Sequence, residues 1–191
     1  MRESLRRIAR LFVRPLQEWE RIAREPTSVD TLIRCCIVPL ALLPPMATYI
    51  GMRTFDAEWD PDHGFFVPSE LIFSAAATTL FTIIVSIFVL AGIFVVLAPM
   101  FGSVRDYRAA LNLASYGAAP LLIAGATLIL PAMVIVASVG LVHSLFLYWV
   151  GASAVLKVRK DDRAEFVGIS MTLLTVLSTL AGASASQAGL F

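Results

Sequence analysis

The side chains of this sequence that could transfer protons or bind ligands are few and lie far apart along the chain. His143 is the one imidazole inside a long apolar stretch. An ionisable side chain in apolar surroundings is a candidate proton relay or ligand contact. The alternative, which we favour, is a neutral imidazole that is hydrogen-bonded to Ser138, Ser144 or a backbone carbonyl within a helical bundle.

A second polar group consists of Asn112, Ser115 and Tyr116. Asn112 and Tyr116 are four residues apart and would share one face of a helix. They could form a gate or a lipid-headgroup site. We favour the alternative, which is hydrogen bonding between helices at a close contact that the neighbouring small residue Gly117 permits.

Two further groups of residues could bind a metal ion or carry a covalently attached lipid. Glu58, Asp60, Asp62 and His63 offer oxygen and nitrogen ligands for a divalent cation. The same Asp-Pro-Asp-His-Gly run is typical of a turn, and we expect a solvated acidic loop. The adjacent pair Cys35-Cys36 could accept a palmitoyl group, but we expect small apolar side chains. The sequence therefore predicts neither a metal site nor a cofactor.

Motifs of catalysis are missing from the sequence. There is no phosphate-binding Walker motif, dinucleotide-binding glycine motif, zinc-protease His-Glu-x-x-His or Gly-x-Ser-x-Gly. We expect no catalytic residues and no enzyme activity. The formal net charge of +1, from 15 basic and 14 acidic residues, gives no reason to expect nucleic acid as a partner.

The elements that carry these residues must lie in a membrane. The chain has 191 residues, is 58% hydrophobic and 15% charged, and has a mean hydropathy of +0.81. Residues 71–104 and 109–156 contain no Asp, Glu, Lys or Arg. A soluble domain of this length cannot hide such stretches from water. Composition therefore excludes a soluble enzyme, a disordered chain and a nucleic-acid-binding module.

The apolar stretches predict an all-α integral membrane protein with five spans. A bilayer core about 30 Å thick needs about 20 helical residues, so the long block 109–156 must contain two spans. The apolar segments lack the alternation of a transmembrane barrel. The predicted spans are residues 31–51, 70–99, 108–130, 132–157 and 164–185. They form a five-helix transmembrane bundle over residues 28–191.

The basic residues predict the orientation of this bundle. Fourteen of the 15 Lys and Arg residues lie in segments 1–34, 99–110 and 156–166, which share one side of a five-span protein. Arg53 alone lies on the other side. Because the cytoplasmic loops of membrane proteins are enriched in Lys and Arg, we expect a cytoplasmic N-terminus and an outer C-terminus in a bacterial inner membrane.

Residues 1–27 predict an amphipathic interfacial helix with a break at Pro15. Apolar residues recur every three or four positions from Leu5 to Ala23, and arginines lie between them. Such a helix suits an anionic membrane surface, with Trp19 at headgroup depth. The residues expected to contact the lipid surface are Arg6, Arg7, Arg10, Arg14 and Trp19.

Prolines and small residues predict how the spans pack. Pro39, the pair Pro44-Pro45 and Pro120 lie inside predicted spans, and each removes one helical hydrogen bond. Small residues let helices approach closely. The residues expected to pack in this way, within the chain or against a partner, are Gly117, Gly182, Ser186 and Gly189.

Three stretches resemble the Ypt-interacting-protein (Yip) domain family. They are Trp-Glu-Arg-Ile-Ala-Arg-Glu-Pro-Thr-Ser at residues 19–28, Leu-Asn-Leu-Ala-Ser-Tyr-Gly-Ala-Ala-Pro at residues 111–120, and the aromatic-rich span ending at residues 145–157. Tyr116-Gly117 followed by Pro120 is the most distinctive piece. The chain starts directly with the amphipathic segment and so resembles the short bacterial members of the family.

The resemblance implies five spans and a scaffold or adaptor rather than a reaction. Eukaryotic members are linked to small GTPases and vesicle traffic, and they usually carry a long polar N-terminal region that is not seen here. We therefore expect a non-catalytic membrane scaffold that binds lipid and either other integral membrane proteins or a further copy of itself. One alternative is a permease for small molecules, lipids or ions, suggested by the proline-broken first and third spans together with His143 and Tyr116. Another is an accessory subunit of a larger complex.

Overall fold

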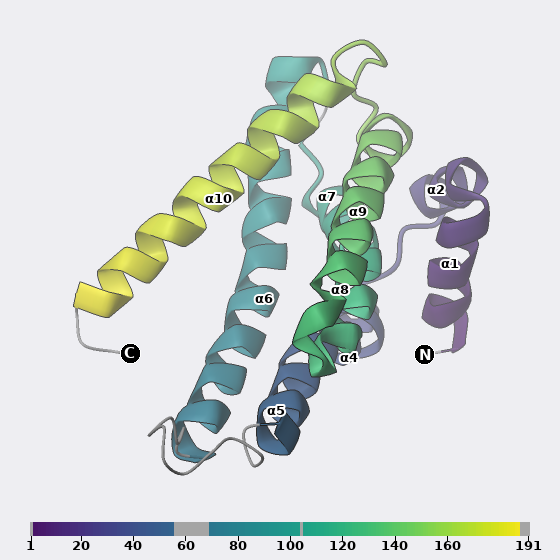
Figure 1. The fold of residues 1–191 in the computed structure, drawn as a ribbon. Coiled ribbons are helices and arrows are strands. Elements are labelled where there is room, and N and C mark those ends of the chain that lie inside the picture. Colours follow the sequence, from purple (N-terminus) through teal and green to yellow (C-terminus); the bar gives the residue numbers. More distant parts are fainter. Residues whose placement is uncertain (1, 56–68, 104, 188–191) are drawn as a thin grey trace.

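The computed structural model describes residues 2–55, 69–103 and 105–187, and this part of the chain is built from helices (Figure 1). Five helical stretches are long and apolar enough to cross a membrane. They are Val29–Thr54, Ile72–Phe101, Tyr107–Ile129, Val134–Val155 and Arg163–Ala183. Each overlaps the range that the sequence predicts, and the predicted all-α membrane bundle is confirmed.

The helices follow one another in a simple order. Two short helices, α1 (Arg2–Val13) and α2 (Pro15–Arg24), precede the spans. The first three spans are composite, and their parts are α3 (Val29–Leu32), η1 (Ile33–Ile37), α4 (Val38–Ala41) and α5 (Leu43–Phe55), then α6 (Ser69–Leu97) and η4 (Ala98–Phe101), then α7 (Tyr107–Gly117), α8 (Ala119–Gly125) and η5 (Ala126–Ile129). After the short turn η6 (Pro131–Met133), the last two spans are α9 (Val134–Val155) and α10 (Arg163–Gln187).

Prolines account for most of the breaks within the spans. The π-helical turn η1 comes just before Pro39, and the pair Pro44-Pro45 lies in the first turn of α5. Pro120 lies in the first turn of α8, where the N–H of Leu121 donates to Ser144 Oγ of α9 at 3.0 Å. The hydroxyl of Ser144 thus accepts a hydrogen bond from a backbone N–H at the break. In lipid no water is present to do so.

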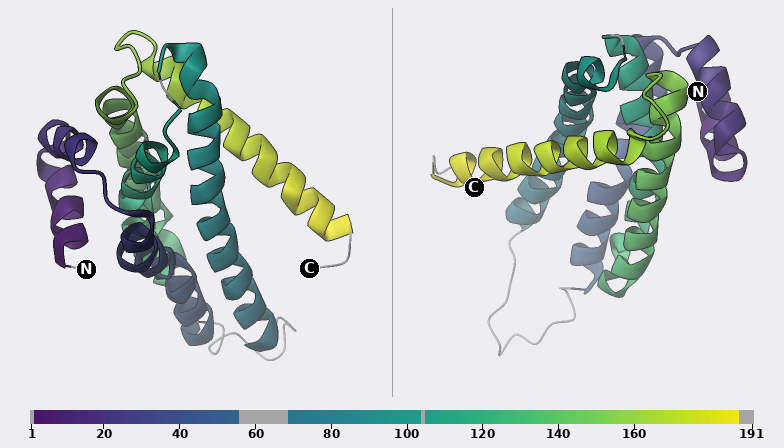
Figure 2. Two further views of the ribbon diagram at one scale, coloured as in Figure 1. Left: turned by 180° about the vertical axis from the view of Figure 1, so that it is seen from behind. Right: turned by 90° about the horizontal axis from the view of Figure 1, so that it is seen from above.

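The core of the bundle is packed with apolar side chains from α6, α7, α9 and the start of α10. Phe94 and Phe166 are fully buried, and their ring centroids lie 5.4 Å apart. Leu113 and Leu147 are also fully buried. Beyond this contact, α10 diverges from the bundle toward its C-terminal end (Figures 1 and 2).

The N-terminal helices pack on the bundle, on the side of α9 away from α10 (Figure 2). The buried face of α1 consists of Ser4, Arg7, Ile8 and Leu11. The break predicted at Pro15 is confirmed, since α1 and α2 meet there. The apolar residues from Leu5 to Ala23 do not form one buried face, because Leu5, Phe12 and Leu16 are exposed. The chain turns at Arg14, whose φ of −139° and ψ of 65° are not helical. The faces of α1 and α2 are therefore not continuous across the break at Pro15.

Candidate functional site

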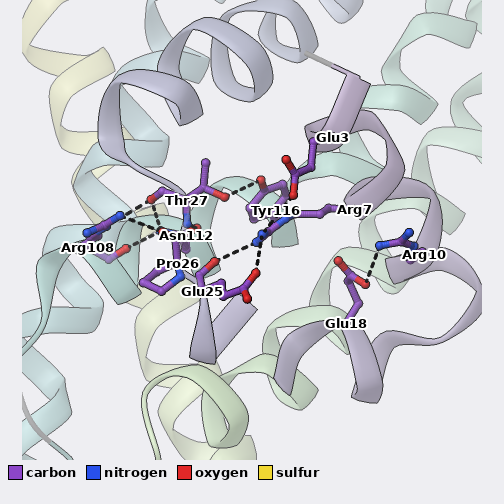
Figure 3. Close-up of polar contacts among 10 residues, drawn as sticks. All are labelled: Glu3, Arg7, Arg10, Glu18, Glu25, Pro26, Thr27, Arg108, Asn112 and Tyr116. Atoms are coloured by element: carbon purple, nitrogen blue, oxygen red, sulfur yellow. Dashed lines mark hydrogen bonds and ion pairs between the residues drawn. The ribbon is translucent and has the colours of Figure 1, made fainter. Parts of the chain in front are cut away.

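The segment between α2 and α3 is held against the third span by the side chain of Asn112. Its Oδ1 accepts a hydrogen bond from the N–H of Thr27 at 3.0 Å, and its Nδ2 donates to the carbonyl of Thr27 at 3.0 Å (Figure 3). Asn112 is fully buried. One amide thus satisfies both backbone groups of Thr27, which lies 85 positions away.

Two further residues on the same face of α7 bind this segment. The hydroxyls of Tyr116 and Thr27 lie 2.9 Å apart, and Arg108 Nη2 donates to the carbonyl of Pro26 at 2.8 Å. Arg108, Asn112 and Tyr116 recur every four residues and so share one helical face. We call these three residues, together with Pro26 and Thr27, the linker clamp. Ser115 lies outside it, because its hydroxyl donates to Leu111 of its own helix.

Arg7 of α1 reinforces the linker clamp from the other side. Its Nη1 donates to the carbonyl of Glu25 at 3.0 Å, and its Nη2 lies 3.6 Å from a carboxylate oxygen of Glu3 and 3.9 Å from one of Glu25 (Figure 3). Arg7 is only 6% exposed. The prediction that Arg7 contacts the lipid surface is therefore wrong, because its guanidinium holds the N-terminal helices together.

Trp19 is also an interior residue. Its side chain is fully buried, and a Cβ atom added at Gly151 of α9 would lie 2.8 Å from its Cε2 atom. The missing side chain of Gly151 makes room for the indole. Trp19 therefore does not contact the lipid surface as predicted, because it is buried and anchors α2 on α9. Arg6, Arg10 and Arg14 are exposed.

His143 lies on α9 among aromatic rings rather than in a polar cluster. It stacks on Phe12 of α1 with ring centroids 5.0 Å apart and lies 6.1 Å from Phe146. Its Nε2 atom is buried and has no hydrogen-bond partner among the described residues. The expected partners are engaged elsewhere, since Ser138 donates to the carbonyl of Val134 and Ser144 accepts from Leu121. His143 thus contributes to the contact between α1 and the bundle.

The linker clamp joins two of the three stretches that carry the family resemblance. Comparison with protein families gives a match to the Yip1 domain over residues 9–182. The chain belongs to the Yip1 domain family. The match covers both sides of the linker clamp, the first four spans and all but the last residue of the fifth. No curated protein and no solved structure matches the chain.

The predicted packing residues of this Yip1 domain lie in different surroundings. A Cβ atom added at Gly117 would lie 2.3 Å from a ring carbon of Tyr148, so α7 and α9 approach closely there. A Cβ atom at Gly182 would meet nothing within 4 Å in the described part of the chain. Ser186 lies near the end of α10, and Gly189 lies outside the described residues.

The remaining candidate ligands of the Yip1 domain do not form a described site. The acidic loop with Glu58, Asp60, Asp62 and His63 lies outside the described residues. Among the described residues, no three His, Cys, Asp or Glu side chains are close enough to hold a metal ion. Cys35 and Cys36 are free thiols.

Sequence reasoning missed Thr27 and Arg108 as members of the polar site. Nothing in their local sequence marks these two residues, because the role of each depends on a hydrogen bond to a residue more than 80 positions away. The available signal was the position of Pro26-Thr27 inside one of the stretches that resemble the family.

Proposed function

We propose that this Yip1 domain is a non-catalytic membrane scaffold. In this proposal, its N-terminal helices bind anionic lipid headgroups of a bacterial inner membrane, and its spans bind other integral membrane proteins or a further copy of the chain. The N-terminus is cytoplasmic and the C-terminus lies outside. The linker clamp is the observation on which the proposal rests, because it fixes an amphipathic basic segment in one place on a membrane bundle.

The position of the N-terminal helices supports lipid binding. α1 contacts η1 at the start of the first span, and α2 contacts α9 near Gly151, close to the loop that holds Lys157 and Arg159. α2 therefore lies near the end of α9 that leads into a basic loop, whereas α1 also reaches His143 in the middle of α9. Exposed Arg6 would contribute about 1 kcal/mol near an anionic surface.

The last span supports the partner-binding part of the proposal. Away from its first turns, α10 exposes Val176, Leu177 and Leu180, and it diverges from the rest of the bundle (Figure 1). Thr172, Thr175 and Thr179 add hydroxyls that are bonded to the helix's own carbonyls. A face of this kind suits contact with another transmembrane helix.

The packing of the bundle favours a scaffold over a permease. The centre between α6, α7 and α9 is occupied by Phe94, Leu113 and Leu147, all fully buried. A transport pathway would need polar groups along a route through this region. The Yip1 family is also non-enzymatic in general.

Affinity purification in a mild detergent, with bound lipids and proteins identified by mass spectrometry, tests the proposal. We expect anionic phospholipid and at least one membrane protein, or a second copy, to co-purify. The variant Arg6→Gln should retain less anionic lipid, whereas Arg53→Gln at the other end of the first span should not change it. A chain that purifies without lipid or protein partner contradicts the proposal.

A further inference from the structure

A charged groove lies between α1 and α2 and is lined by residues of both helices. It encloses about 570 Å³ and is lined by the guanidinium-bearing residues Arg10, Arg14 and Arg21, all of them exposed. Glu18 lines the same groove but is only 4% exposed. The groove thus combines three cations at its rim with one buried carboxylate.

The carboxylate of Glu18 is incompletely paired. Its Oε2 atom lies 3.8 Å from Nη1 of Arg10, which is an ion pair but too long for a hydrogen bond (Figure 3). Its Oε1 atom is buried and has no hydrogen-bond partner among the described residues. Because a buried carboxylate is costly without donors, this site is suited to a ligand that brings N–H groups.

We infer that this groove binds the phosphoethanolamine headgroup of a membrane phospholipid. Arg14 and Arg21 bind the phosphate, and Glu18 accepts hydrogen bonds from the primary ammonium group. The geometry points to this class because guanidinium groups pair with phosphate oxygens, while the carboxylate needs a cationic donor. The inference rests on the proposed function, which places α2 at the headgroups. The anionic lipid of that proposal is bound outside the groove, by Arg6, which does not line it.

Apolar side chains beside the groove favour a lipid over a soluble phosphate compound. Val13 is 77% exposed and Leu16 is 64% exposed, although both belong to the same helical corner as the arginines. A soluble ligand would leave these side chains in water. Acyl chains next to a bound headgroup would cover them.

Glu18 also predicts which phospholipids the groove rejects. Phosphatidylglycerol brings a phosphate but no cation, so it gives Glu18 no further hydrogen-bond donor and is repelled by its charge. Phosphatidylcholine brings a quaternary ammonium group that has no N–H to donate. Loss of one charged hydrogen bond should weaken binding of either lipid about tenfold relative to phosphatidylethanolamine.

Native mass spectrometry of the full chain, released from detergent with each lipid in turn, tests the inference. We expect phosphatidylethanolamine to be retained about tenfold more strongly than phosphatidylcholine or phosphatidylglycerol, and soluble phosphoethanolamine to compete poorly. Equal retention of phosphatidylcholine overturns the role of the ammonium group. Soluble phosphoethanolamine that binds as tightly as the lipid overturns the membrane source.

A pair of glutamate variants locates the selectivity. Glu18→Gln should lose the preference for phosphatidylethanolamine, whereas Glu20→Gln should keep it, because Glu20 is exposed and pairs with Arg24. An unchanged preference in Glu18→Gln overturns the inference. The lipid series on the unaltered chain remains decisive if that variant does not fold. Strongest retention of phosphatidylglycerol contradicts only this inference, whereas retention of no phospholipid contradicts the proposed function as well.

Discussion

Asn112→Ala should release the N-terminal helices from the bundle while leaving the spans folded. The substitution removes both hydrogen bonds to the backbone of Thr27. Each bond contributes about 1 kcal/mol net, and a backbone group left without a partner adds about 1–3 kcal/mol. Arg108 Nε still approaches the carbonyl of Thr27 at 3.4 Å, so only the N–H of Thr27 is left without a partner. The lost hydrogen bond and the unpaired N–H together give an expected loss of about 2–4 kcal/mol.

This loss should raise the population of the released state by about 30- to 1000-fold. Hydrogen exchange of the α2 amides in detergent micelles measures that population, since an isolated helix of 10 residues is not stable in water. The α2 amides should therefore lose protection by this factor. The amides of α6 and α9 should keep theirs.

Ser115→Ala is the matched control for this experiment. Ser115 is buried on the same helix, but its hydroxyl bonds only to Leu111, four residues before it. Its removal should leave the exchange of α2 unchanged. Unaltered protection in Asn112→Ala, or an equal loss in Ser115→Ala, would refute the role assigned to the linker clamp.

Two further predictions concern packing. Trp19→Ala should weaken docking of α2 by about 3–5 kcal/mol, because the indole is fully buried. Leu16→Ala should change docking by less than about 0.5 kcal/mol, because Leu16 is exposed. Hydrogen exchange of the α2 amides distinguishes the two variants. Gly117→Val should destabilise the bundle by about 1–3 kcal/mol through a clash with Tyr148, whereas Gly182→Val should not destabilise it. Thermal unfolding in detergent measures both variants. Equal melting temperatures would show that α7 and α9 are not in close contact.

The spans were predictable because the physics that defines them is local. Uninterrupted apolar residues fix where a helix can cross the bilayer, and Pro131 marks the division of the long uncharged block where the structure also divides it. The break at Pro15 and the irregular first span followed from the missing N–H of proline.

The polar site was only partly predictable. The sequence placed Asn112 and Tyr116 on one helical face that contacts a neighbour, but it could not identify Thr27 as that neighbour. The roles of Trp19 and Arg7 were misjudged for the same reason. An amphipathic helix has the same pattern whether its apolar face meets lipid or protein, and the cavity over Gly151 that accepts Trp19 depends on a distant segment.

The five-span arrangement itself is tested most directly by labelling single cysteines in intact cells with a membrane-impermeant maleimide. In a background with Cys35 and Cys36 replaced by serine, Arg53→Cys and Lys160→Cys place one thiol at each end of the bundle. We predict labelling of position 53 in intact cells and of position 160 only after lysis. Labelling of both positions from the same side would contradict the arrangement of the spans and the placement of the N-terminal helices.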